Sequence, residues 1–231
     1  MLFSKKGKDP ALPIHEMTEI GVCLALVGGF LDAYTYLSRG GVFANAQTGN
    51  IVLMSLAAAN LDWKKAGYYF IPIFAFFLGV VVTEYLKRKF DGRRFLRCEH
   101  TVMLIELILL GIIGFLPQEI PDPAVNITVS FICSMQVNSF RKIVGAPYAT
   151  TMCTGNLRSA SEKFFLWAFH HDRNAGVVCL RYLGIILSFC IGAAGGALLT
   201  VALGGTAVWF CCGILAIVLA VMLYDSKRTA A

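Results

Sequence analysis

Long apolar runs constrain this chain most, and residues 66–86 (AGYYFIPIFAFFLGVVVTEYL) are the clearest of them. At a rise of 1.5 Å per residue, a helix of this length crosses a hydrocarbon core of about 30 Å. Hydrophobic residues make up 57% of the chain and charged residues 15%, against about a quarter in soluble domains. The sequence therefore predicts an all-α polytopic membrane protein, whose further apolar runs are 18–37, 101–116, 125–140 with its flanks, 175–200 and 205–224.

The charge and cysteine patterns exclude several classes of protein. The net charge is +6, but the basic residues lie beside apolar runs, as residues that set membrane topology do. We therefore expect the protein to lie in a lipid bilayer and not to bind nucleic acid. The eight cysteines lack metal-ligand spacing and lie mostly within apolar runs, where cysteine packs as a small hydrophobe. We therefore expect no metal site and no cofactor.

The sequence also lacks the motifs of an enzyme or a primary pump. It contains no H-E-x-x-H motif, no recognisable nucleophile with its base, and no P-loop for ATP. We therefore predict that the protein is not an enzyme.

The chain repeats a three-residue motif, Thr48-Gly49-Asn50 and Thr154-Gly155-Asn156, at an offset of 106 residues. At the same offset the apolar runs of the two halves overlap without gaps. We interpret this as a duplication, with a first repeat at 18–116 and a second at 125–224. Residues 117–124 then form the connecting loop, and residues 1–17 and 225–231 form the terminal segments.

The loop charges bear on whether the short segments after each TGN motif cross the membrane. If they cross, each half has four spans, and the basic loop 87–100 faces outside while the acidic loop 117–124 faces inside, against the positive-inside tendency. If they only enter the membrane, both loops follow that tendency, and Lys64 and Lys65 are the one misfit. Three crossings per half then require inverted halves. We favour this 3+3 inverted repeat with two half-helices that start at the TGN motifs and with both termini in the cytoplasm.

The TGN motifs are the predicted site. Broken helices at corresponding positions of inverted halves point to a transport site near the midplane, where irregular backbone must be buried or line a polar cavity. Thr48 and Thr154 are expected to cap the following helices, and Gly49 and Gly155 to permit a sharp turn. We expect these residues to bind the solute together with Asn50 and Asn156.

Other polar residues of the apolar runs are candidates for the same site. Asp32 has Asn138 as its repeat mate, and Gln136 is nearby in sequence, which suggests one polar face formed by both halves. Asp32 has the alternative role of bonding the backbone of a broken helix. Arg158 follows the second TGN motif, where it either attracts an anion, forms a structural salt bridge, or lies nearer the cytoplasm.

Two features concern packing. Glu106, in an apolar run, is expected to form a structural ion pair within the bundle. Gly192 and Gly196 form a G-xxx-G pair that permits close helix approach, either within one chain or in a homodimer.

The stretches GGFLDAYTYLSRGGVFANAQTGN and TGNLRS resemble those of the YoaK-type bacterial membrane proteins, a domain-of-unknown-function family. The resemblance covers nearly the whole chain. It implies a small protein of the bacterial inner membrane and no established substrate.

Together the patterns favour a channel or secondary transporter for a small polar or anionic solute. The alternative is a membrane anchor or assembly partner without transport activity. In that case the polar groups at the TGN motifs would be sealed against one another.

Overall fold

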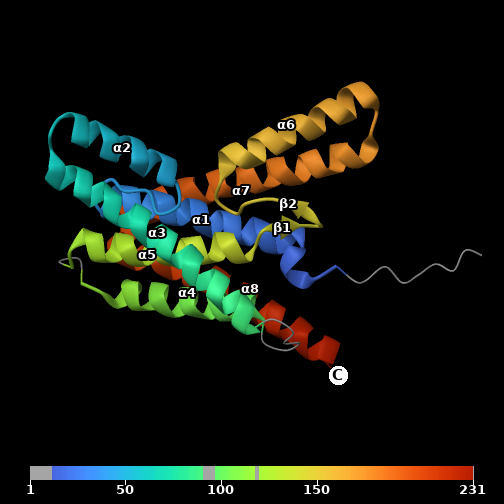
Figure 1. Cartoon of the computed structure of the whole chain (residues 1–231). Helices are drawn as coiled ribbons and strands as arrows, with labels where there is room; N and C mark the ends of the chain where they lie inside the picture. Colours follow the sequence, from blue (N-terminus) through green and yellow to red (C-terminus); the bar gives the residue numbers. More distant parts are fainter. Residues whose placement is uncertain (1–11, 91–96, 118–119, 231) are drawn as a thin grey trace, which may run out of the picture.

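The computed structural model describes residues 12–90, 97–117 and 120–230, which form a bundle of helices of unequal length (Figure 1). Predictions for the terminal segment 1–11, for parts of the loops 87–100 and 117–124 (residues 91–96 and 118–119) and for residue 231 concern residues outside this part of the chain. The all-α prediction is confirmed, since the strands β1 (Lys142–Ile143) and β2 (Ala146–Pro147) are only two residues each. The helices are η1 (Ile14–Glu16), α1 (Thr18–Ser38), α2 (Gln47–Ala59), α3 (Trp63–Phe90), α4 (Cys98–Phe115), α5 (Asp122–Ser139), α6 (Cys153–His170), α7 (Arg173–Leu203), η2 (Gly204–Val208) and α8 (Trp209–Ala230).

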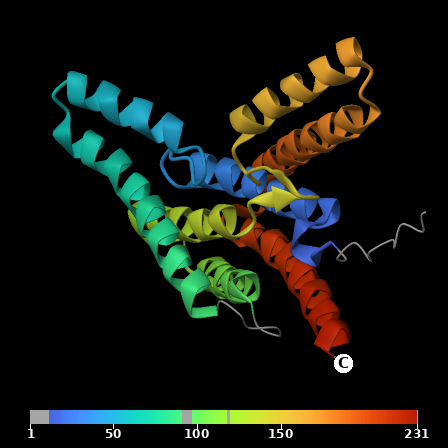
Figure 2. The same ribbon diagram turned by 45° about the vertical axis from the view of Figure 1, so that its right-hand side comes forward.

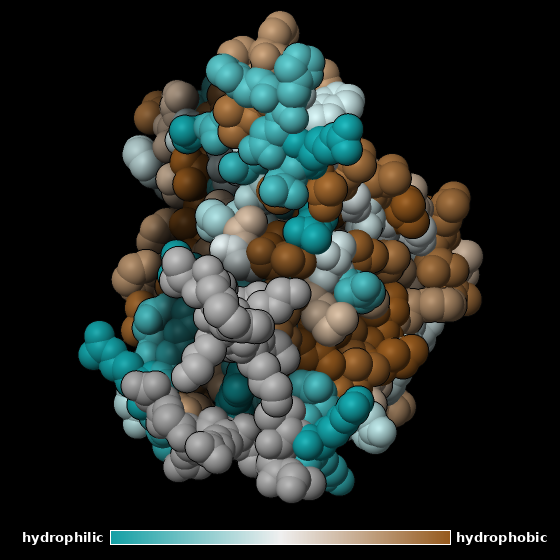
Figure 3. All heavy atoms as spheres, turned by 90° about the vertical axis from the view of Figure 1, so that its right-hand side faces the viewer, coloured by the Kyte–Doolittle hydropathy of each residue, from teal (hydrophilic) through white to brown (hydrophobic). Residues whose placement is uncertain are grey.

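Four helical stretches of the described chain are long and apolar enough to cross a membrane, judged by length and composition. They are residues 18–38 (α1), 63–90 (α3), 98–115 (α4) and 173–228, and the last contains both α7 and α8. Large apolar side chains are exposed along α3, α7 and α8. In the face seen in Figure 3, hydrophobic residues form a broad area on one flank, and hydrophilic residues gather above and below. This distribution fits a helical membrane protein.

Two helical hairpins, α2–α3 and α6–α7, are built in the same way. Each turn contains a residue with positive φ, Leu61 (59°) or His171 (55°). The next residue is an aspartate whose carboxylate accepts a hydrogen bond from the start of the following helix: Asp62 from Lys65 N at 3.0 Å and Asp172 from Asn174 N at 2.9 Å. These turns lie 110 residues apart rather than 106, so the gapless alignment of the halves was wrong. Helix α6 is longer than α2.

Close packing joins the first half of the chain to the second. A Cβ atom added to Gly192 would collide with the Leu26 carbonyl, and one on Gly196 would lie 2.7 Å from the Phe30 oxygen. The G-xxx-G pair of α7 therefore packs against α1 of the same chain. Likewise, a Cβ on Gly79 of α3 would collide with the backbone of α5. Helix α3 thus packs on α5 as α7 packs on α1.

The main apolar core lies among α1, α4, α5 and α8 and includes Leu24, Leu110, Ile132 and Leu215. Glu106 is fully buried there, and neither of its carboxylate oxygens has a hydrogen-bond partner among the described residues. The predicted ion pair of Glu106 is therefore absent from the described part of the chain.

Figure 2 shows how the short helices are placed over this core. Helices α2 and α6 start close together beside α1 and diverge toward the ends of their hairpins, and Figure 1 shows the same arrangement from another angle. The first turns of α2 and α6, which carry the two TGN motifs, therefore lie near each other.

Candidate functional site: a cavity at the starts of α2 and α6

A cavity of about 880 Å³ lies where α2 and α6 begin. Both first turns line it, through Thr48 of α2 and Thr154, Gly155 and Asn156 of α6. Its other walls come from α1, α3, α7 and the loops that precede α2 and α6. Segments far apart in the sequence thus form one cavity of the size that binds small molecules in proteins, about 300–1,000 Å³.

The asparagines of the two TGN motifs hold the loops that lead into the helices. Asn50 Oδ1 accepts a hydrogen bond from Phe43 N at 3.1 Å, and its Nδ2 donates to Phe43 O at 2.7 Å. Asn156 makes the same two bonds with Ala149, at 3.2 and 2.6 Å. Phe43 and Ala149 are also 106 residues apart. Asn50 is fully buried and does not line the cavity, so its predicted role in solute binding gives way to a structural one.

The threonines and glycines of the motifs do not act as predicted. The residues before the helices are Ala46 and Met152, and neither caps its helix through a side chain. Thr48 and Thr154 lie within the first turn and face the cavity instead. Gly49 and Gly155 are also helical and lack a positive φ, so neither makes the turn.

The turn before α2 is made at Gly40 and Gly41, which have φ values of 77° and 74°. Such values favour glycine because a Cβ atom would clash with the backbone. Of the motif glycines, a Cβ on Gly155 would meet open space, whereas one on Gly49 would lie 3.1 Å from the Phe43 ring.

Asp32 of α1 lines the cavity and also supports the loop before α2. Its Oδ1 accepts a hydrogen bond from Asn45 N at 2.7 Å, and its side chain is 5% exposed. Among the described residues, no basic group lies within ion-pair distance of this carboxylate. Asp32 therefore combines the two roles that the sequence left open: it bonds the backbone and it presents an acid to the cavity.

Three predicted site residues lie elsewhere. Arg158 is 83% exposed and pairs with Glu162 one turn further along α6, at 3.0 Å, so its salt bridge is local. Gln136 is buried against α1, where its Nε2 donates to Leu24 O at 3.5 Å. Asn138 bonds Glu84 of α3 at 2.9 Å. Because none of the three lines the cavity, the predicted polar face shared by Asp32 and Asn138 does not form there.

Two cavity residues were missed by the sequence analysis. Asn45 and Thr151 are 106 residues apart, one in each loop before a TGN helix. Both line the cavity and are 5% and 6% exposed. Asn45 Nδ2 donates to Gly28 O at 3.1 Å, while Asn45 Oδ1 and Thr151 Oγ1 have no partner among the described residues. The repeat offset could have identified this pair, but Asn and Thr differ too much to align by identity.

Comparison with known proteins identifies the family of the chain. A family model described as "Protein of unknown function (DUF1275)" matches residues 20–221. The chain belongs to the DUF1275 family. Within curated proteins, it is 27% identical over 176 residues to the UPF0700 transmembrane protein YoaK of Bacillus subtilis (strain 168). The match covers 74% of this chain and 78% of that relative. No solved structure matches significantly.

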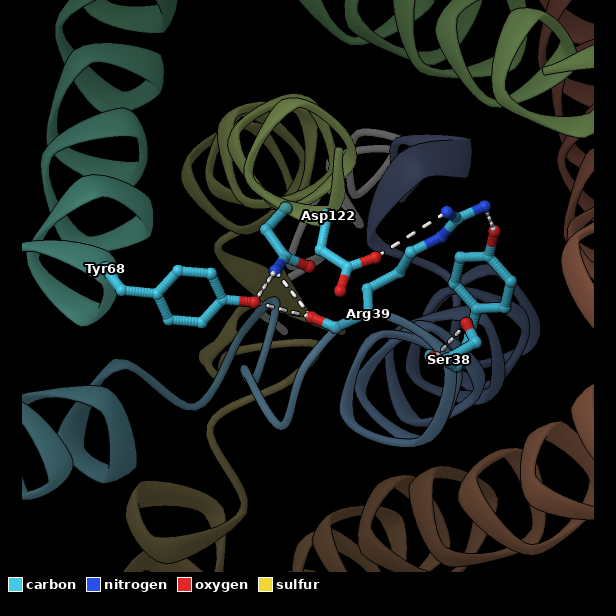
Figure 4. Close-up of polar contacts among 6 residues, drawn as sticks. Ser38, Arg39, Tyr68 and Asp122 are labelled. Carbon is cyan, nitrogen blue, oxygen red and sulfur yellow. Dashed lines mark hydrogen bonds and ion pairs between the residues drawn. The ribbon is translucent and has the colours of Figure 1, made fainter. Parts of the chain in front are cut away.

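The DUF1275 match includes a second polar cluster, at the end of α1 (Figure 4). Arg39 is 2% exposed; its Nη1 lies 3.7 Å from Asp122 Oδ1, and its Nη2 donates to Tyr34 Oη at 3.4 Å. The Arg39 carbonyl accepts hydrogen bonds from Tyr68 Oη at 3.1 Å and from Asn126 Nδ2 at 2.8 Å. This cluster joins the end of α1 to the starts of α3 and α5.

A related contact in this DUF1275 chain joins η1 to the loop after α5. Glu16, which is 106 residues before Asp122, accepts hydrogen bonds from Val144 N through its backbone oxygen at 2.7 Å and from Gly145 N through Oε2 at 3.1 Å. Gly145 is in turn 106 residues after Arg39. The positions of Arg39 and Asp122 thus correspond, 106 residues away, to those of Gly145 and Glu16. The first pair is joined by an ion pair, and the second by a hydrogen bond from a backbone N–H to a carboxylate.

Proposed function

We propose that this protein is a channel or secondary transporter for a small polar solute. In this proposal, six spans form two inverted halves, and α2 and α6 are broken segments whose first turns meet at the solute site. The protein lies in the bacterial inner membrane with both termini in the cytoplasm.

The interchange of helix contacts supports a two-fold repeat, and the loop charges favour the inverted form of it. Exchanging α1 with α5 and α3 with α7 turns the α3–α5 contact into the α7–α1 contact. Exchanging α4 with α8 at the same time turns the α4–α5 contact into the α8–α1 contact, and both are present. A pseudo-two-fold axis that relates the halves accounts for this pattern, as in transporters built from inverted repeats.

Helix length and composition support the broken segments. Helix α2 has 13 residues, a length of about 20 Å, which falls short of a hydrocarbon core of about 30 Å. Helices α5 and α6 have 18 residues each and neither is among the candidate spans, but α6 carries the exposed ion pair Arg158–Glu162, whereas α5 packs in the main apolar core. Helices α2 and α6 are each paired with a long helix, α3 or α7. We therefore assign α2 and α6 as segments that enter the membrane without forming complete crossings.

The observation that carries the proposal is the cavity at the two TGN turns. Irregular backbone at membrane depth is tolerated where it is buried in protein or lines a water-filled space. The loops before α2 and α6 meet both conditions, since Asn50 and Asn156 satisfy their backbone and a cavity lies beside them. Asp32, the one charged residue among the described residues that line it, disfavours a purely anionic solute.

Cysteine accessibility tests this proposal directly. Cys153 lines the cavity, and Cys133 is fully buried in the core. Two variants that each retain one of these cysteines are reconstituted in liposomes and treated with a membrane-impermeant, charged thiol reagent. We expect Cys153 to react, and Cys133 to react only after denaturation. An unreactive Cys153 in the folded protein would support the sealed anchor instead.

A further inference from the structure

The cavity presents an acid with no basic partner. Asp32 is the only charged residue among the lining residues, and its carboxylate forms no ion pair with any described side chain. A buried charge is stabilised when it is paired or hydrogen-bonded; Asp32 has hydrogen bonds from the loop before α2, including that from Asn45 N, but no counter-charge among the described residues. A cationic group of the solute would complete this site.

A partial positive charge, opposite to the negative charge of Asp32, comes from the N-termini of α2 and α6 in the same cavity. The first N–H groups of an α-helix have no acceptor within the helix, and the macrodipole gives this end a partial positive charge. In α6 the first bond back to the loop is made by Asn156 N, to Met152 O. The N–H groups of Thr154 and Gly155, which line the cavity, have no acceptor among the described residues. These groups suit a carboxylate.

Independent of the helix ends, two neighbouring side chains hold unused hydrogen-bonding capacity. Asn45 Oδ1 and Thr151 Oγ1 are unpartnered, belong to side chains that are more than nine-tenths buried, and line this cavity. The Asn45 oxygen can accept from an ammonium group, and the Thr151 hydroxyl can donate to a carboxylate. A buried polar atom without a partner is costly, so a polar ligand at this point would satisfy both atoms.

The rest of the wall is apolar and aromatic. It includes Tyr36, Phe43, Phe76, Tyr148 and Phe189. Aromatic faces accommodate both an apolar group and a neighbouring cation.

We propose that the solute is a zwitterion with an apolar substituent, of the α-amino-acid type. Its ammonium group pairs with Asp32, its carboxylate binds at the N-terminal turn of α6, and its apolar group packs against the aromatic wall. This inference rests on the proposed transport function and specifies the substrate class of the same cavity.

Three probes that share one phenyl ring separate the two poles. L-phenylalanine carries both charges, phenethylamine only the cation and 3-phenylpropionate only the anion. Each is added at equal concentration to the variant that retains only Cys153, and the rate of alkylation is measured. We expect phenylalanine to slow alkylation at least about tenfold more than either single-pole compound, which corresponds to about 1.4 kcal/mol.

Variants then assign the cationic pole. Asp32→Asn keeps an acceptor for Asn45 N and should abolish protection by phenylalanine, whereas Glu162→Gln, at the exposed ion pair, should leave it intact. If Asp32→Asn does not fold, the three-probe comparison on the unaltered Asp32 decides the question.

The outcomes also separate this inference from the proposed function. Equal protection by either single-pole compound overturns the zwitterion, and so does no protection by any of the three. Neither result contradicts the proposed transport function as long as Cys153 reacts with the water-soluble reagent. An unreactive Cys153 contradicts the transport proposal itself.

Discussion

Asn50 and Asn156, 106 residues apart, each form hydrogen bonds with both backbone groups of the residue seven positions earlier. We call these two asparagines clamps, because their side chains hold the loops that lead into α2 and α6. Each amide replaces the partners that a buried loop would otherwise lack. The repeated asparagine therefore holds the loop, while its neighbours Thr48, Thr154 and Gly155 face the cavity.

Replacing either clamp should destabilise the fold. Asn50→Ala or Asn156→Ala removes the two hydrogen bonds to Phe43 or Ala149, and Asn50→Ala also removes one to Gln47. Each change leaves a part-buried N–H and C=O unpaired, for a loss toward the lower end of about 1–3 kcal/mol for each unsatisfied group. Thermal unfolding in detergent measures this loss. Asn60→Ala is the matched control, since Asn60 is exposed at the end of α2 and makes one bond to Leu56 O. A control that melts as low as the clamp variants would show that the clamps have no special role.

The contact between α1 and α7 predicts opposite effects for two nearby glycines. Gly192→Ala should destabilise the protein because its Cβ would collide with the Leu26 carbonyl. Gly195→Ala meets open space and should be neutral, or raise stability by up to about 1 kcal/mol through helix propensity. Melting temperatures of the two variants compare them directly. If Gly192→Ala is as stable as Gly195→Ala, the close approach of α1 and α7 is incorrect.

The Arg39–Asp122 pair predicts an unequal response to removal of either partner. Asp122→Asn leaves the buried guanidinium without its counter-charge and should cost about 1–3 kcal/mol, below the value for a fully buried pair because Asp122 is 39% exposed. Arg39→Met removes the buried charge and leaves an acid that water can reach, so the loss should be smaller. A double-mutant cycle by chemical denaturation measures both. A larger loss for Arg39→Met would mean that the bond to Tyr34 outweighs the ion pair.

Membrane topology follows from the inverted-repeat proposal. A cysteine at Pro121, exposed before α5, should be labelled from the outside of intact cells, and one at Lys89, exposed near the end of α3, only after permeabilisation. The reverse pattern would reject three crossings per half, because it is the pattern that four spans per half predict.

Much of the fold was predictable because membrane helices are encoded by long apolar runs. The predicted run 66–86 lies within α3 (Trp63–Phe90), and the predicted run 18–37 matches α1 (Thr18–Ser38) to within one residue. The recurring motif was detectable at Thr48 and Thr154, but the greater length of α6 than of α2 was not, because polar residues such as Glu162 and Lys163 carry no apolar period that marks a helix end. Side-chain roles were harder to predict. Sequence spacing puts Arg158 two residues from Asn156, yet helical geometry turns them to different faces, so one is buried and the other exposed.

Gly155 offers a way to close the cavity without disturbing the fold. A side chain at this position meets open space and lies on the cavity wall, so Gly155→Leu should fold with a melting temperature near that of the wild type and reduce the alkylation rate of Cys153. Gly49→Leu should instead lower the melting temperature, since its Cβ would press on Phe43. Equal losses of stability in the two variants would contradict the difference between the two motif glycines.

Solute release from liposomes tests the central claim most directly. Liposomes with wild-type protein, with the Gly155→Leu variant or without protein are loaded with a mixture of small polar solutes of both charges, and mass spectrometry follows what leaves. The account predicts that at least one solute escapes faster through the wild type than from the other two preparations. Equal retention of every solute in all three, with Cys153 of the wild type unreactive toward the impermeant reagent, would contradict transport through this cavity.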